Sequence, residues 1–209
     1  MHVQKLLYYA QGRHLAFKGQ PIFTDTIEAW THGPVVRAVY VGEGYRSTVD
    51  FNPGSGTTTL PTIGGGFITK LNSSGGLVWA RALESGSVQS LDVDAAGSIY
   101  ATGGFSGSVD LNPGAGSDSR TIAGGTDIFV VKLTAAGNYS WGETFGGTGY
   151  DGGFALTDGI GIDVDSTGTV HLVGAYEEAV DFDPNPMATY NLINPGTFRN
   201  AFRLRLLQV

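Results

Sequence analysis

The sequence contains no cysteine, few basic residues and no long hydrophobic run. Without cysteine the chain cannot form disulfides, bind zinc through thiolates or use a thiol nucleophile. The formal net charge of −7, from 12 Lys and Arg against 19 Asp and Glu, excludes the clustered cations that bind nucleic acids and anionic membranes. No apolar stretch reaches the length of a membrane-spanning helix, and no signal-peptide core is visible. We therefore expect neither a nucleic-acid nor a membrane partner, and the compartment stays open.

Glycine is abundant, and its distribution divides the chain. Of 209 residues 33 are glycine, but only three of them lie in the first 40. Residues 1–40 carry a net charge of +2, whereas residues 41–209 carry 30 glycines and a net charge of −9. Such a change of composition marks a boundary, so we predict two domains, residues 1–40 and 41–209.

The first segment has the pattern of an amphipathic helix. Apolar residues recur at three- and four-residue steps from Val3 to Phe17, which predicts a helix ending near Lys18. Gly19 and Pro21 then supply stop signals. One such helix has no partner for its apolar face, so we expect this segment to be an incomplete domain.

The rest of the chain is a repeat. The stretch VYVGEGYRSTVDFNP at 39–53 aligns without gaps on IYATGGFSGSVDLNP at 99–113 and VHLVGAYEEAVDFDP at 170–184, with spacings of 60 and 71 residues. Further matches are FITKLNSSGGLVWARAL at 67–83 with FVVKLTAAGNYSWGETF at 129–145 and FRLRL at 202–206, and LDVDAAG at 91–97 with IDVDSTG at 162–168. Alternating apolar residues between turn clusters predict about four short antiparallel strands per period, which is the size of a propeller blade.

We therefore predict a mostly β fold: an incomplete propeller-like array of two to three four-stranded antiparallel sheets, preceded by the N-terminal helix. Such an array has too few blades to close a ring. Its terminal sheets are expected to expose apolar faces and strand edges, which predicts self-association or poor solubility.

Two resemblances follow from these motifs. Residues 39–209, with TVDFNPG, DIFVVKLTAAGNYSW and IDVDSTGTVHLVG, resemble the SBBP-type β-propeller repeats, which implies a propeller fold without family-wide catalytic residues. Residues 4–36, with KLLYYAQG, PIF, IEAW and GPVV, are similar to the opening of the Panacea antitoxin or proteolytic-adaptor domain. That second resemblance implies binding of a toxin or a protease client by protein contact, with Tyr8, Tyr9 and Trp30 as candidate contact residues. Because most of the Panacea domain is missing, we expect a fragment or a chimeric reading frame.

Paired acids before a glycine suggest calcium. Asp92 and Asp94 precede Gly97, and Asp163 and Asp165 precede Gly168. Numbered as an EF-hand loop they fill positions 1 and 3, but the ligands at positions 5 and 12 are missing. An Asp side chain that hydrogen-bonds to the backbone of its own turn accounts for the same sequence pattern, so we predict that these acids stabilise turns and bind no metal. Asp50, Asp110, Asp181 and Asp183 are expected to be turn acids too.

The remaining signals point away from catalysis. GTGYDG at 147–152 spells a dinucleotide-binding motif, but the sequence that follows predicts a strand where the motif needs a helix, so a flexible connecting loop is expected. His171 aligns with Tyr40 and Tyr100, a structural aromatic position. Trp79 and Trp141 are equivalent, which predicts packing between repeats. We expect no enzyme and no cofactor.

Three functions fit these patterns to different degrees. The first is a noncatalytic repeat module that binds or scaffolds. The second is an antitoxin or proteolytic adaptor acting through residues 1–40. A propeller enzyme is disfavoured, because propeller active sites collect residues around a closed channel.

Overall fold

The computed structural model describes residues 39–42, 49–60, 65–152, 160–185, 187–196 and 198–207. The chain divides into two compact units, Met1–Val35 and Val36–Val209, and every described residue lies in the second unit. The helix predicted over residues 3–18 falls outside the described residues.

All regular elements of the described residues are β-strands, which confirms the mostly β prediction for this part of the chain. The strands are β1 (Val39–Gly42), β2 (Gly66–Leu71), β3 (Leu77–Leu83), β4 (Gly86–Val93), β5 (Ile99–Phe105), β6 (Ser108–Asp110), β7 (Ser119–Thr121), β8 (Asp127–Leu133), β9 (Tyr139–Gly147), β10 (Gly161–Val164), β11 (Val170–Tyr176), β12 (Ala179–Asp181), β13 (Asn191–Ile193) and β14 (Asn200–Leu206). No helix in this part of the chain is long and apolar enough to cross a bilayer.

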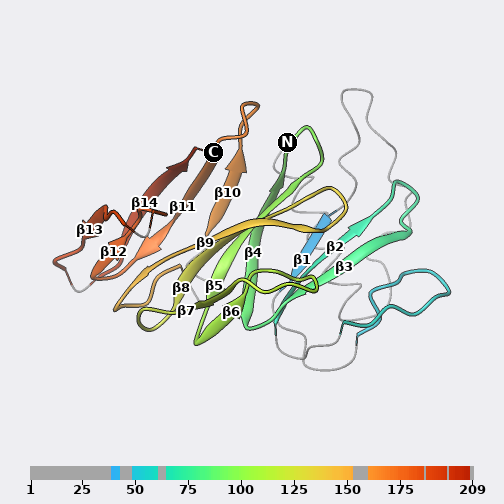
Figure 1. Cartoon of the computed structure of the whole chain (residues 1–209), viewed down its shortest axis with the longest axis horizontal. Coiled ribbons are helices and arrows are strands. Elements are labelled where there is room, and N and C mark those ends of the chain that lie inside the picture. The colour runs from blue at the N-terminus through green and yellow to red at the C-terminus, as the bar shows by residue number, and fades with distance from the viewer. Residues whose placement is uncertain are drawn as a thin grey trace. The chain divides into compact units, whose positions relative to one another are not determined.

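Three antiparallel sheets of three or more strands follow one another along the described part of the second unit (Figure 1), and β6 and β7 form a separate two-stranded sheet. The first sheet has the order β1-β2-β3, and the third sheet has the order β10-β11-β14. The second sheet contains β4-β5-β8-β9 and is extended by β12, which joins β9 through Gly146 and Gly147, and by β13. We predicted four strands in each sheet. That arrangement is found only in the central part of the second sheet, β4-β5-β8-β9, whereas the first and third sheets have three strands each among the described residues.

The register of the strands shows the repeat in three dimensions. In the second sheet Ile99 pairs with Leu133. Its aligned counterpart in the third sheet forms the same pair, Val170 with Leu206. In the first sheet the register is offset by one residue, because Val39, the counterpart of Ile99, lies opposite Lys70 and not opposite the next residue along β2. Two of the three matching stretches are thus superposable in pairing, and the other is displaced by one position.

A small hairpin follows the second strand of each repeat, and one aspartate organises it. Asp110 accepts hydrogen bonds from the backbone N–H groups of Asn112 (2.9 Å) and Asp118 (2.8 Å) at the base of β6–β7. The equivalent donors are Asn52 and Thr58 for Asp50, and Asp183 and Tyr190 for Asp181. The prediction that these acids support turns is confirmed.

Two apolar cores hold the sheets together. One contains residues of the first and second sheets, and the other contains residues of the second and third. Trp79 lies at the first junction, where its Nε1 donates to the carbonyl of Ala135 (3.2 Å) and its ring lies so close to Gly137 that a Cβ there would be 2.8 Å away. Trp141 packs against the second core, edge-on to Tyr100. The predicted packing of both tryptophans between repeats is confirmed.

Candidate functional site

The calcium candidates nearest the turns are used by the turns themselves. The Asp94 carboxylate accepts from the N–H of Ser98 (2.8 Å) and the hydroxyl of Tyr100 (3.2 Å), and Gly97 has φ of 82°. Although burial opposes ionisation, these hydrogen bonds and the charge of Lys132 lower the pKa of Asp94. This is the turn chemistry that the sequence predicted.

Asp165 repeats this arrangement in the third sheet. Its carboxylate accepts from the hydroxyl of Thr167 (2.6 Å) and from the N–H groups of Thr167 (2.8 Å) and Thr169 (3.0 Å). Those hydrogen bonds lower the pKa of Asp165. Gly168 has φ of 83°, a conformation that glycine adopts at no steric cost.

The other two candidates have different surroundings. Asp92 accepts from the N–H of Val164 (2.7 Å), so its carboxylate connects the second sheet to β10. Asp163 is exposed on β10. Among the residues that the structure describes, no group of three or more His, Cys, Asp or Glu side chains could hold a metal ion.

Two buried acids, which the sequence analysis did not select as site residues, are Asp151 within GTGYDG and Asp127 at the start of β8. Asp151 is fully buried and accepts from the N–H groups of Gly147 (2.8 Å) and Glu177 (2.9 Å). The Thr126 hydroxyl in turn donates to the Asp151 carbonyl (3.0 Å). Residues 147–152, which we predicted to be a flexible connecting loop, are therefore hydrogen-bonded through Asp151 to Thr126 and Glu177.

Asp127 is the second acid of this pair. It is 4% exposed, and its Oδ2 accepts from the N–H of Ala123 (2.9 Å), while its Oδ1 has no hydrogen-bond partner. Burial, reinforced by the charge of Asp151, raises the pKa of Asp127 to about 6. A carboxyl group at the start of an apolar strand, in TDIFVV, is the sequence signal for this burial.

A polar cluster ties the β6–β7 hairpin to β9. Arg120 forms an ion pair with Asp118 (2.8 Å) and donates to the Gly142 carbonyl (3.0 Å), and the Tyr139 hydroxyl also donates to Asp118. Each of these polar groups has a partner within the cluster. The contacts therefore account for the cluster as a structural link between the hairpin and β9, and no ligand is needed to explain it.

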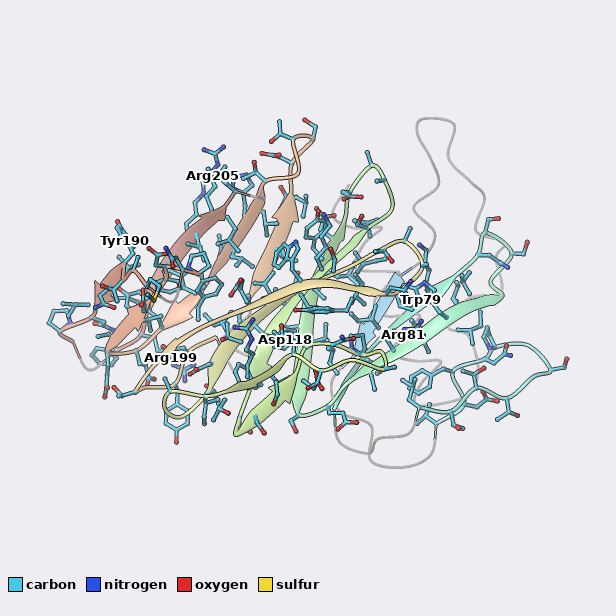
Figure 2. The ribbon with its side chains drawn as sticks, viewed as in Figure 1. Trp79, Arg81, Asp118, Tyr190, Arg199 and Arg205 are labelled. Carbon is cyan, nitrogen blue, oxygen red and sulfur yellow. The ribbon has the colours of Figure 1, made fainter. Side chains whose placement is uncertain are left out.

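The outer face of the third sheet differs from the faces that form the two cores. The side chains on the inner face of the third sheet are apolar, and they are Ile162, Val170, Leu172, Phe202, Leu204 and Leu206. The side chains between them point outward, and they are Asp163, His171, Val173, Arg203 and Arg205. Figure 2 shows Arg205 extending away from the ribbon. Arg203 is aligned with Val130 and His171 with Tyr100, which are both fully buried in the second sheet.

This outer face is the strongest candidate site of the described residues. Arg205 lies opposite His171 across the sheet, and His171 Nε2 lies 3.3 Å from the Asp165 carboxylate. Val173 is half-exposed beside them. Among the described residues, most of the large exposed apolar side chains lie in the last third of the sequence: Tyr150, Val173, Met187, Tyr190, Ile193, Phe198 and Leu207. The terminal face that we predicted to be apolar is thus polar and cationic in its middle.

The sequence analysis did not select these arginines, although FRLRL contains the signal. Alternation in that stretch places the apolar residues on one face and Arg203 and Arg205 on the other. The predicted contact residues Tyr8, Tyr9 and Trp30 lie outside the described residues.

Comparison with known proteins concerns the N-terminal part of the chain. A family model described as "Antitoxin SocA-like, Panacea domain" matches residues 3–52. Antitoxin SocA of Caulobacter vibrioides (strain NA1000 / CB15N) is 53% identical over 38 residues, which cover 18% of this chain and 20% of that antitoxin. The resemblance predicted for the N-terminal segment is confirmed at this level, and the matched segment extends past residue 40 into the first copy of the repeat. The chain spans about one fifth of the length of the curated relative it matches.

Proposed function

We propose that this protein acts by protein–protein contact, as an antitoxin-like or adaptor-like binder whose partner is held through the N-terminal segment. The observation that carries the proposal is the match of residues 3–52 to the Panacea antitoxin domain. Tyr8, Tyr9 and Trp30 lie in the matched segment. Aromatic side chains of this kind supply large contact areas at protein interfaces, so we assign them to the partner-binding surface.

The second unit is proposed to be a noncatalytic partial propeller of the SBBP type that presents a binding or scaffolding surface. The shared register of the second and third sheets supports a repeat of blade-like units. The repeated aspartate-centred hairpins support it as well. This part of the chain is the second candidate function, and the outer face of the third sheet, with its exposed strand edge, is its proposed contact surface.

A growth assay tests the N-terminal function. The tagged full chain is used to isolate a protein that copurifies in constant ratio from the native host, and that protein is then expressed alone. We expect it to arrest growth, and we expect coexpression of the full chain to restore growth. The triple variant Tyr8→Ala, Tyr9→Ala, Trp30→Ala should fail to restore it, whereas Arg203→Glu in the second unit should restore it fully. A copurifying protein that leaves growth unchanged, or rescue by the triple variant, would contradict the proposal.

A further inference from the structure

A short joint connects the second sheet to strand β12 of the third repeat. Strand β12 pairs with β9 at two positions, Gly146 and Gly147. The chain then continues into residues that lie against the segment before β8. Two backbone hydrogen bonds of 2.8 Å join these segments, from the N–H of Gly125 to the Gly149 carbonyl and from the N–H of Asp151 to the Thr126 carbonyl. We call residues 123–127 and 146–151 together the joint.

Asp127 places a carboxyl group inside this joint. Its Oδ2 accepts from the N–H of Ala123 (2.9 Å), whereas its Oδ1 is buried without a hydrogen-bond partner. A Cβ added to Gly146 would lie 2.0 Å from the Asp127 Cγ. The carboxyl group therefore rests directly on the backbone of β9, at one of the two residues that pair with β12.

The surroundings of Asp127 oppose a negative charge. Phe105, which lies opposite Asp127 on β5, is fully buried, and residues 123–126 carry no charged side chain. The charge that acts on Asp127 is that of Asp151, which is fully buried as well. An ionised Asp127 is thus met by one backbone N–H and by a second buried acid.

The other charged groups around the joint have partners of their own. The charges of Glu177 and Arg199 act in opposite directions on the pKa of Asp151, and the two form an ion pair with each other (2.8 Å). Asp181 lies opposite Gly146, but its Oδ1 accepts from two backbone N–H groups of its own hairpin. Glu178 hydrogen-bonds to the Thr148 hydroxyl at the surface.

We propose that the joint is a proton-operated latch that holds the β12–β13 hairpin on the second sheet. With Asp127 protonated, a neutral carboxyl group packs on Gly146 and the latch is closed. When Asp127 loses its proton, its buried Oδ1 carries charge that water solvates only if residues 123–127 and 146–151 separate, and β12 then loses its pairing with β9.

The direction of the pH dependence follows from proton binding. Burial and the charge of Asp151 raise the pKa of Asp127 to about 6 in the closed joint, against an ordinary value of 3.8 that we expect in the open joint. The closed joint therefore binds the proton more tightly, so it is favoured at low pH and weakened as the pH rises through about 6.

Hydrogen exchange followed by mass spectrometry on the full chain tests the latch at several pH values, after correction for the intrinsic pH dependence of exchange. We expect the protection of residues 123–127, 146–151 and 179–181 to fall about tenfold between pH 5 and pH 8. Peptides from β5 (Ile99–Phe105) should keep their protection, because the opening is local.

Three variants assign the effect to the carboxyl group. Asp127→Asn keeps the shape of the side chain without its charge, so the protection of the joint should no longer depend on pH. Asp94→Asn is the matched control, since Asp94 stabilises the β4–β5 turn, and it should leave the pH dependence of the joint intact. Gly146→Ala puts a methyl group where the carboxyl group lies, so the joint should exchange at pH 5 as fast as it does at pH 8 in the natural chain.

Any of three results rules out the latch. The first is constant protection of the joint between pH 5 and pH 8 in the natural chain. The second is an equal loss of protection in β5, which would indicate global unfolding. The third is an unchanged pH dependence in Asp127→Asn. The latch is a conformational change within the second unit and is measured without a growth assay, so its failure and failure of the antitoxin-like function are distinguishable.

Discussion

The second and third sheets have the same strand register, but aligned side chains that are buried in the second sheet lie on an outer face in the third. Tyr100 and Val130 of the second sheet are fully buried against the third, whereas the aligned His171 and Arg203 lie on an outer face. The alignment in sequence therefore fixes how strands pair, and the identity of alternate side chains fixes whether another sheet can stack on the result.

The largest expected effect comes from placing an arginine, the residue found at the aligned position of the outer face, in the core. Val130→Arg places an unpaired cation between the second and third sheets, because Val130 is fully buried among apolar neighbours. We expect a loss of about 4 kcal/mol or more in the free energy of unfolding, measured by urea titration with circular dichroism.

Val173→Arg is the matched control, since the same substitution there falls on the outer face. Val173 is 49% exposed, and its variant should change stability by less than about 0.5 kcal/mol. Equal losses at the two positions would contradict the distinction between the two sheets.

A second comparison concerns the two junctions. Trp79 is buried and packs on Gly137 at the first junction, whereas Trp141 is only partly buried at the second. Trp79→Ala should therefore cost about 3 kcal/mol in the free energy of unfolding, and Trp141→Ala about half as much. Urea titrations of both variants provide the measurement, and a larger loss for Trp141→Ala would place the tighter junction at the third sheet.

The buried acid pair predicts a pH dependence that originates in the second sheet. The folded-state pKa of Asp127, about 6, lies above the ordinary value of 3.8, so the folded state retains a proton that the unfolded state releases. Its favourable contribution is present below pH 3.8 and is lost as pH rises through about 6. The loss amounts to about 3 kcal/mol at most.

Asp127→Asn should flatten this part of the stability curve and raise stability at pH 8 by about 2 kcal/mol, as measured by urea titration at several pH values. Asp94→Asn is the control of opposite sign. The pKa of Asp94 is lowered in the folded state, so its contribution is present at neutral pH and its removal should destabilise the protein. The stability of the natural chain could instead rise between pH 4 and 8 while that of Asp94→Asn does not. That result would contradict the assignment of the pH dependence to Asp127.

These features differ in how far the sequence predicts them. The repeat, the turn acids and the equivalent tryptophans are local or periodic signals, and the structure confirms each of them. The burial of Asp127 and the anchoring role of Asp151 depend on the approach of residues 123–127 to residues 146–151, which no periodicity encodes. The outward direction of Arg203 is readable from FRLRL, but which sheet face lacks a neighbour depends on the stacking of whole sheets.

A smaller effect is expected from the hairpin acids. Asp110→Ala removes the acceptor for two backbone N–H groups at the base of β6–β7, and the expected loss is about 1 kcal/mol. Asp50→Ala should have a smaller effect, because Asp50 is exposed and water can replace its carboxylate. Thermal melts of both variants compare the two repeats, and equal shifts would mean that the surrounding sheet does not matter.

The smallest change in stability, and the most direct conversion of one sheet into the other, is expected from the double variant His171→Tyr, Arg203→Val. Both positions lie on the outer face, so the free energy of unfolding should stay within about 0.5 kcal/mol. The new tyrosine has a ready partner, because Tyr100 in the second sheet donates to Asp94 and Asp165 stands in the equivalent place beside His171. The new valine adds to the apolar surface of Val173, so the face becomes one on which another sheet can stack. Sedimentation velocity should therefore show stronger association for the double variant than for the natural chain at equal concentration, whereas unchanged association would mean that these two side chains do not control stacking.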